Sequence, residues 1–171
     1  NNDIIFVGNL NERKNPMLLI KAYEKINDYN LKMKIIGDGH LQFKIQNYIK
    51  DKKIFRFVSI LKNLDRNKVL KSIGKSRVLV LPSNYETFGV VIIEAYSMGV
   101  PVVMTDSLGV RDLNHKDCSI LVKKKNAESL AKSIIKVLKN NHFRHDKIIR
   151  HYNKNFSPSV ITGKIEKLYS S

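Results

Sequence analysis

Short, uninterrupted apolar runs recur along the chain and alternate with segments in which apolar residues follow helical spacing. We expect strands at residues 3–7, 31–36, 54–58, 78–81, 102–104 and 119–122. Because each run is apolar at successive rather than alternate positions, both faces of each strand must be covered by other elements. This pattern predicts an α/β fold with a doubly wound, parallel, six-stranded, Rossmann-like sheet.

Helical spacing first appears after Asn15 and Pro16, where Asn15 is expected to cap the helix and Pro16 to take its first position. Further helices are expected within residues 41–49, 69–73, 88–98 and 127–138, and two more close the chain. A length of 171 residues, 43% of them hydrophobic, suits one domain of ordinary size. We therefore expect a single domain over residues 1–171, with a terminal helix region at 155–171.

The chain is strongly basic, with 31 Lys and Arg against 15 Asp and Glu, and residues 121–171 hold most of the excess. Such a block attracts nucleic acid, anionic lipid or a phosphorylated substrate, although it is also typical of an ordinary solvated face. Modules that bind nucleic acid usually interleave exposed aromatic residues with the basic ones. The aromatic residues here are at least as well interpreted as core anchors of helices: Phe143, Tyr152, Phe156 and Tyr169. We expect no nucleic-acid partner and retain a peripheral contact with anionic membrane.

Cysteine and histidine give no pattern typical of a metal site. Cys118 is the single cysteine, which excludes an internal disulfide and a cysteine-based metal cluster. His142-x-x-His145 places two imidazoles on one helix face, but no third ligand is evident, so we predict no metal. The chain begins without Met or a signal-peptide pattern, which indicates a processed product or an excised fragment. We expect a cytoplasmic location.

In a doubly wound sheet, ligands bind outside the carboxyl ends of the strands. The candidate site should therefore lie in the loops at 8–14, 37–40, 59–61, 82–89 and 105–110. The dinucleotide fingerprint G-x-G-x-x-G is missing, since Gly37-x-Gly39 is only a fragment of it, and there is no P-loop. A nicotinamide cofactor is disfavoured.

The loop at 82–89 runs from an expected strand directly into an expected helix. The first amides of a helix have no internal partner, and the helix dipole is positive there. Gly89 removes the side chain where an anion would approach the backbone, so the amides of Phe88, Gly89 and Val90 predict a phosphate site. Glu86 would reach a sugar hydroxyl beyond it.

Glu94 is a carboxylate among apolar neighbours on the same expected helix. A buried carboxylate needs strong partners, and a ribose diol can donate two hydrogen bonds to it. Alternatively, Glu94 shares a solvent-facing stripe with Ser97 or caps a neighbouring loop.

Gly8 and Lys14 follow the first expected strand. Gly8 lets a ligand approach the backbone, and Lys14 could neutralise phosphate charge. The alternative is that Lys14 is simply a solvent residue before a helix.

These residues together resemble the carboxyl-terminal domain of the retaining GT-B glycosyltransferases, the glycosyl transferases group 1 family. The central match is an E-x7-E motif from Glu86 to Glu94, within the segment PSNYETFGVVIIEAYSMGVPVV. The first family motif, Gly-Arg-Leu with a following Lys, corresponds to Gly8-Asn9-Leu10 and Lys14. The resemblance spans nearly the whole chain.

The resemblance implies a nucleotide-sugar donor site, with UDP as the expected nucleotide and no metal. Glu94 would bind the ribose hydroxyls, Glu86 would contact the transferred sugar, and Lys14 would stabilise the departing diphosphate. The amides of residues 88–90 would bind sugar hydroxyl and pyrophosphate, Gly8 and Asn9 would line the same site, and residues 59–61 would flank the base. The acceptor would lie mainly on an amino-terminal domain outside this chain.

The sequence departs from the family pattern at two positions. Asn9 replaces the usual Arg, which removes one charge partner of the phosphates, and Leu108-Gly109 replaces the common Gly-Gly. Two alternatives are a nucleotide-sugar epimerase of the same architecture and a basic module that binds nucleic acid or membrane. The epimerases resemble this chain in fold but lack the Phe-Gly and E-x7-E context.

Overall fold

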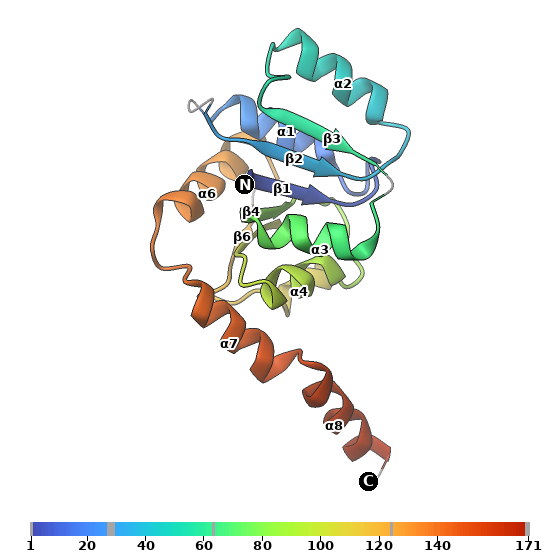
Figure 1. The fold of residues 1–171 in the computed structure, drawn as a ribbon, viewed down its shortest axis with the longest axis vertical. Coiled ribbons are helices and arrows are strands. Elements are labelled where there is room, and N and C mark those ends of the chain that lie inside the picture. Colours follow the sequence, from blue (N-terminus) through green and yellow to red (C-terminus); the bar gives the residue numbers. More distant parts are fainter. Residues whose placement is uncertain (1, 27–29, 63, 124, 170–171) are drawn as a thin grey trace.

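The computed structural model describes residues 2–26, 30–62, 64–123 and 125–169, so both ends of the expected domain, Asn1 and Ser171, lie outside the described residues. One six-stranded sheet lies at its centre (Figure 1), with the strand order β3-β2-β1-β4-β5-β6 and every neighbouring pair parallel. The strands are β1 (Asn2–Val7), β2 (Met33–Ile36), β3 (Val58–Leu61), β4 (Ser76–Leu81), β5 (Val102–Thr105) and β6 (Ser119–Val122). The doubly wound, Rossmann-like α/β fold predicted from the sequence is confirmed.

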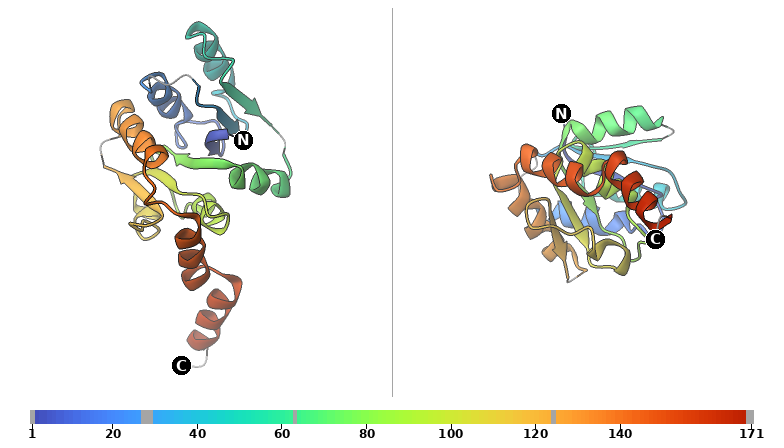
Figure 2. Two further views of the ribbon diagram at one scale, coloured as in Figure 1. Left: turned by 60° about the vertical axis from the view of Figure 1, so that its left-hand side comes forward. Right: turned by 90° about the horizontal axis from the view of Figure 1, so that it is seen from below.

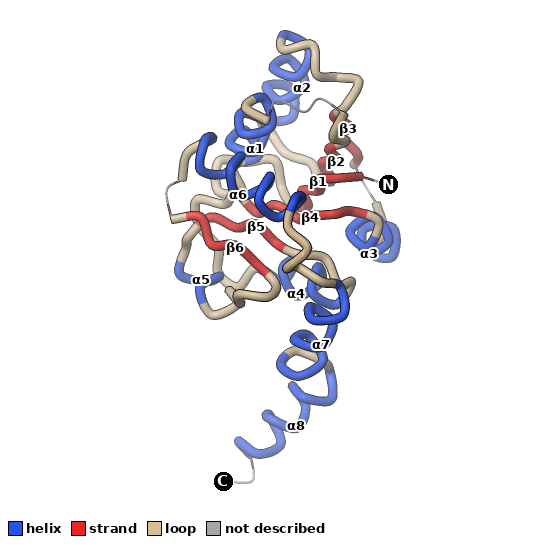
Figure 3. Tube along the Cα trace, turned by 90° about the vertical axis from the view of Figure 1, so that its left-hand side faces the viewer, coloured by secondary structure: helices blue, strands red, loops and turns tan. Residues whose placement is uncertain are grey.

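Helices cover both faces of this sheet (Figure 3). They are α1 (Pro16–Glu24), α2 (Gln42–Asp51), α3 (Arg66–Gly74), α4 (Val90–Ser97), α5 (Leu108–Arg111), α6 (Ala127–Lys139), α7 (His145–Asn155) and α8 (Pro158–Tyr169). None of the described helices is long and apolar enough to cross a membrane.

Two separate apolar cores explain why the strands are apolar at successive positions. Phe6 of β1 packs into a core with residues of α1, α2 and α6, whereas its neighbour Ile5 packs into a second core with residues of α3, α4 and α7. Both side chains are fully buried. A strand between two such cores has no face on which polar residues are tolerated.

The start of α1 follows local rules that are visible in the sequence. The Asn15 side chain accepts a hydrogen bond from the backbone N–H of Leu18 at 3.3 Å, and Pro16 occupies the first helical turn. Asn15 adopts φ 48°, a left-handed conformation that asparagine tolerates better than most residues. The expected cap is therefore confirmed.

The prediction for the third strand was wrong in position. The apolar run at 54–58 forms a turn after α2, in which the Phe57 N–H donates to the Ile54 carbonyl at 3.0 Å, and β3 begins only at Val58. Lys53 precedes this turn with φ 56°, so the chain reverses before the strand can start. Residues 59–61, expected as a loop, therefore lie within β3. The short helix α5 was not predicted, because four residues are too few to show a period.

The last two helices extend away from the sheet (Figures 1 and 2). Helix α7 packs against α4, where the rings of Tyr96 and Phe156 lie 6.4 Å apart. Helix α8 has no buried residue, and its apolar side chains Ile161, Ile165 and Leu168 are all exposed. The aromatic anchors expected here are thus divided: Tyr152 and Phe156 pack against the core, whereas Tyr169 is 89% exposed.

Gly37 and Gly39 bring two strand-to-helix loops into direct backbone contact. The Gly8 N–H donates to the Ile36 carbonyl at 3.0 Å, and the Leu10 N–H donates to the Asp38 carbonyl at 2.8 Å. A Cβ added to Gly37 would overlap the Gly8 carbonyl oxygen, and one added to Gly39 would lie 2.5 Å from the Leu10 carbonyl oxygen. This glycine pair serves loop packing, so its likeness to a dinucleotide motif has a structural explanation.

We expect Gly37→Ala to lower the free energy of unfolding by roughly 2–3 kcal/mol, because the new Cβ meets backbone and φ is 154°. Urea unfolding at 25 °C measures this. Gly163→Ala in α8 is the matched control, since a Cβ there has no atom within 4 Å. Equal losses in the two variants would contradict the close approach of the loops.

Candidate functional site

The strand order places a topological switch point between β1 and β4. From β1 the chain proceeds outward to β2 and β3, and from β4 it proceeds in the other direction to β5 and β6. In doubly wound sheets, ligands bind outside the carboxyl edge at such a point, beside the loops that follow β1 and β4 here. The candidate residues Gly8, Lys14 and Glu86 all lie on these two loops.

Lys14 and Glu86 connect the loops that follow β1 and β4. The Lys14 ammonium forms an ion pair with the Glu86 carboxylate, and the Ser83 hydroxyl donates to the same oxygen, Oε1, at 2.9 Å. The Lys14 side chain is 15% exposed and that of Glu86 only 3%. The interpretation of Lys14 as a solvent residue before a helix is therefore wrong, because a buried carboxylate holds it in place.

Asn84 joins the same two loops through further hydrogen bonds. Its backbone N–H donates to the Arg13 carbonyl at 2.8 Å, and its side-chain amide donates to the Glu12 carbonyl at 2.8 Å. The Asn15 amide donates in turn to the Asn84 side-chain oxygen at 3.2 Å. These contacts fix the spacing of the loops independently of the charged pair.

The amino terminus of α4 follows Glu86 closely in the chain. Gly89 is the N-cap residue with φ 67°, and the flanking side chains of Phe88 and Val90 are 55% and 54% exposed. The Ile92 N–H donates to the Gly89 carbonyl at 2.8 Å and begins the helix. The predicted phosphate-binding residues therefore lie at the start of α4 close to Glu86, with Gly89 buried between its two exposed neighbours.

Glu94 lies one turn further along α4 on a half-exposed flank. Its carboxylate forms an ion pair with Arg66 of α3, in which Arg66 Nη2 and Glu94 Oε1 lie 3.1 Å apart. The Glu94 side chain is 19% exposed. Its apolar neighbours Val91 and Ile93 pack partly against the core, so the neighbourhood expected from the sequence is present, whereas Val90, one turn before Glu94, is exposed. Arg66 supplies the strong partner that the sequence could not indicate.

Ser83, which the sequence did not single out, and Gly109 also shape the site. Ser83 positions the Glu86 carboxylate, and the Ser83 carbonyl accepts a hydrogen bond from the Thr105 hydroxyl at 2.5 Å. Gly109 packs against the backbone of residues 86 and 87, where an added Cβ would overlap both carbonyl oxygens. Leu108-Gly109 replaces the family's common Gly-Gly. Gly109 is needed for this close packing, whereas Leu108 is 73% exposed.

Two further carboxylates at this edge have hydrogen-bond partners that lower their pKa. Arg111 donates to the Asp106 carboxylate at 2.7 Å, and this contact holds the pKa of Asp106 below its ordinary value. The Gly39 N–H likewise lowers the pKa of Asp38. Among the described residues, the Ser107 hydroxyl is buried at this edge with no hydrogen-bond partner. Asn9 lies exposed on the first loop, where it brings no charge.

Residues 1–155 match the profile of the family described as "Glycosyl transferases group 1". The chain belongs to this family of glycosyltransferases. An uncharacterized glycosyltransferase of Methanocaldococcus jannaschii is 32% identical over 143 residues, which cover 82% of this chain and 37% of the relative. The chain spans less than half the length of the relatives that it matches.

A second relative carries a specific name. It is the N-acetylgalactosamine-N,N'-diacetylbacillosaminyl-diphospho-undecaprenol 4-alpha-N-acetylgalactosaminyltransferase of Campylobacter jejuni, 32% identical over 82% of this chain and 38% of the relative. Among solved structures, a TarM variant of S. aureus in complex with UDP, fondaparinux and alpha-GlcNAc-glycerol has a TM-score of 0.85. It is 25% identical, and the match covers 99% of this chain and 36% of TarM.

We expect Lys14→Met to lower the free energy of unfolding by roughly 3–5 kcal/mol, because it leaves the buried Glu86 carboxylate without its cation. A double-mutant cycle with Glu86→Gln, followed by urea unfolding, should give a coupling energy above about 1 kcal/mol. The matched control is the exposed Glu128–Lys132 pair of α6, for which we expect about 0.3–0.5 kcal/mol. Additive effects of the two site variants would show that the pair contributes no coupling.

Proposed function

We propose that this chain is the nucleotide-sugar-binding, carboxyl-terminal half of a retaining GT-B glycosyltransferase. The donor is a UDP-hexose, and the acceptor is a glycan or a lipid-linked glycan. The observation that carries the proposal is the Lys14–Glu86 contact at the switch point, close to the amino terminus of α4. Family membership of residues 1–155 supports it.

The diphosphate of the donor would lie between Lys14 and the amides of residues 88–90. Lys14 supplies one positive charge, and the α4 terminus supplies N–H donors and the positive end of the helix dipole. Charge therefore develops on the leaving diphosphate in contact with groups that are already in place. These groups need no metal ion, and we expect donor binding without one. Gly8 leaves room for the backbone approach, while Asn9 contributes a polar contact without a charge.

The sugar and the ribose would lie on either side of the diphosphate. Glu86 would accept hydrogen bonds from hydroxyls of the transferred sugar, and Lys14 would then be shared between Glu86 and the phosphate. Glu94 would accept two hydrogen bonds from the ribose diol, with Arg66 holding the carboxylate in orientation. The unpartnered Ser107 hydroxyl offers a further polar group at the same edge.

The names of similar proteins support the class of donor and acceptor. TarM was solved with UDP, and a second structural neighbour, Anabaena HepE, was solved with UDP-glucose. HepE is 19% identical to this chain and so supports the fold alone. The Campylobacter relative is named for a diphospho-undecaprenol substrate, which favours a lipid-linked acceptor and a role in polysaccharide biosynthesis.

The acceptor would bind to an amino-terminal domain facing the carboxyl edge of this sheet. Transfer requires both substrates in fixed contact with water excluded, and this chain supplies one wall of that cleft. A cytoplasmic location and a peripheral contact of the basic residues 121–171 with anionic membrane stay predictions.

We expect Glu94→Ala to weaken UDP binding by ~2–3 kcal/mol, because it removes charge-assisted hydrogen bonds to the ribose. Glu94→Gln should recover part of that loss. Isothermal titration calorimetry with UDP measures both.

The control is Glu128→Ala, which removes an exposed carboxylate from α6 and should leave UDP affinity unchanged. Arg66→Ala is a second comparison: its effect should be smaller than that of Glu94→Ala, because Arg66 touches only the carboxylate. Unchanged affinity in both Glu94 variants would mean that Glu94 serves only its ion pair with Arg66.

We expect the 171-residue chain to bind UDP and to transfer no sugar, because half of the cleft is missing. Radiolabelled UDP-sugars with a lipid-linked acceptor, supplied to this chain and to a longer protein that adds the amino-terminal domain, test this. Transfer by this chain at rates near those of the longer protein would contradict the division of roles between the two halves.

A further inference from the structure

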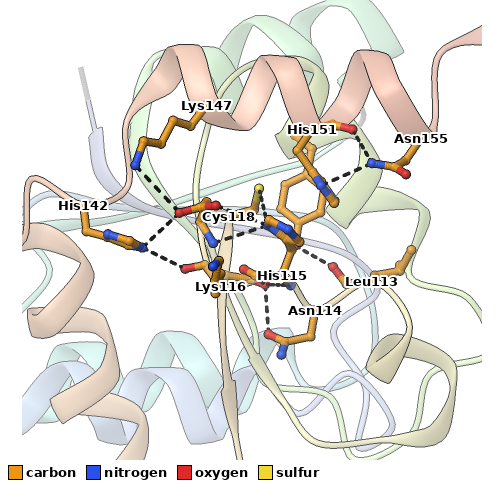
Figure 4. Close-up of polar contacts among 12 residues, drawn as sticks. Leu113, Asn114, His115, Lys116, Cys118, His142, Lys147, His151 and Asn155 are labelled. Carbon is orange, nitrogen blue, oxygen red and sulfur yellow. Dashed lines mark hydrogen bonds and ion pairs between the residues drawn. The ribbon is translucent and has the colours of Figure 1, made fainter.

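His115, Cys118 and His151 converge at the edge of the sheet opposite the donor site (Figure 4). His115 and Cys118 lie in the loop that leads into the amino end of β6, and His151 comes from the middle of α7. The donor residues Lys14 and Glu86 follow the carboxyl ends of their strands, so the two places lie at opposite ends of the parallel sheet.

The three side chains bring their ligand atoms into one small volume. The Cys118 sulfur lies 3.7 Å from His115 Nδ1, and one ligand atom from each residue lies within 4.8 Å of the others. The His115 and His151 rings are stacked with centroids 4.1 Å apart. Cys118 is buried, whereas both histidines are partly exposed to a pocket of about 440 Å³ through which an ion could enter.

We propose that His115, Cys118 and His151 bind a divalent cation of the zinc class. Around tetrahedral zinc, Zn–N distances of ~2.0–2.1 Å and a Zn–S distance of ~2.3 Å place neighbouring ligand atoms roughly 3.3–3.8 Å apart. His115 and Cys118 already have this separation. His151 would have to turn out of its stack with the His115 ring so that a ring nitrogen faces the other two ligand atoms, and the open pocket beside it leaves room for this turn.

Asp117 lies beside the three-residue cluster and is the nearest candidate for a fourth ligand and a second negative charge. Its Oδ2 lies 3.9 Å from His115 Nδ1, and its other oxygen is held by His142 Nε2 at 3.2 Å. Lys147, Arg150 and Lys154 line the same pocket and oppose a bare dication. The thiolate and the Asp117 carboxylate together balance a 2+ ion, and loss of the thiol proton on binding limits the increase in net charge to one unit.

Two neighbouring groups contact the His151 ring. The Asn155 amide lies 3.3 Å from His151 Nδ1, so Nε2 is the nitrogen that can turn toward the other ligands. Tyr96 contacts the ring edge-on, with centroids 5.7 Å apart. A cation here would tie α7 to the loop before β6 and so anchor the helix that leads to α8.

This site differs from the His142-x-x-His145 pair that the sequence suggests. His142 and His145 do not converge on a common point, since His142 pairs with Asp117 and the His145 ring packs against Gly99. The single cysteine excludes a cluster of cysteines, but a mixed site needs only one. No spacing rule links His115 and Cys118 to a histidine 33 positions further on.

The test uses Co²⁺ and Zn²⁺ as probes on the purified chain, reduced and freed of metal. Co²⁺ should give a near-ultraviolet thiolate-to-cobalt charge-transfer band that saturates at one ion per chain, and excess Zn²⁺ should remove it. Because Cys118 is the only cysteine, the band reports its ligation without any substitution. Absence of the band would overturn the proposal and leave a hydrogen-bonded cluster without an ion.

Single substitutions test which side chains bind the ion. His151→Gln and Cys118→Ala should each weaken Zn²⁺ binding at least tenfold in competition with a chromophoric chelator, and Asp117→Asn should weaken it less. His40→Gln is the matched control, because His40 is exposed at the donor edge, and it should bind Zn²⁺ as the parent chain does.

Equal affinity of His151→Gln and the parent would overturn the assignment, as would an equal loss in His40→Gln. Circular dichroism shows whether Cys118→Ala folds. If it does not, the cobalt band of the parent chain and the Zn²⁺ affinity of His151→Gln test the proposal without it. UDP affinity measured with and without Zn²⁺ keeps this outcome separate from that of the donor site, and we expect no change.

Discussion

The buried carboxylate of Glu86 constrains this structure more than any other single group. A carboxylate with a side chain only 3% exposed would be costly without a cation, and Lys14 provides one from a loop 72 positions away in the sequence. The pair forms only because β1 and β4 are neighbours and both end at the same edge. The ion pair therefore depends on the strand order, and it keeps the two loops that carry it at a fixed distance.

Backbone contacts shape the rest of the carboxyl edge. Gly37 and Gly109 each lie where any side chain would overlap a carbonyl oxygen of another loop. The loops after β1, β2, β4 and β5 are consequently packed backbone against backbone, which leaves their polar groups available at the surface. The nucleotide sugar that we propose for these loops would need such a dense arrangement, since N–H donors must reach phosphate oxygens directly.

The opposite edge of the sheet has a different construction. There the charged and ligand-bearing side chains come from α7 and from the loop before β6, and they surround an open pocket. Helix α7 is the last element that packs on the core, since α8 has no buried residue. A contact that fixes α7 thus decides the direction in which the end of the chain leaves the domain.

Much of the fold follows from local patterns that the sequence displays. Apolar runs identified five of the six strands, and the Asn15 cap and Pro16 marked the start of α1, because these depend on neighbouring residues only. The third strand was misplaced because the run at 54–58 is equally suited to a buried turn. The site residues were predicted from their loops and the start of a helix, and motif resemblance then assigned their roles, whereas local sequence alone left both a solvent lysine and a phosphate ligand open for Lys14.

Tertiary structure decided the partners of those residues. The pairing of Lys14 with Glu86, of Glu94 with Arg66, and of His151 with the neighbouring residues His115 and Cys118 each joins segments far apart in the chain. Periodicity and capping rules describe only residues a few positions apart, so they contain no information about such pairs. Electrostatic and hydrogen-bond energies fall steeply with distance, and the distances between these side chains are set by the order of the strands and the packing of the helices on them.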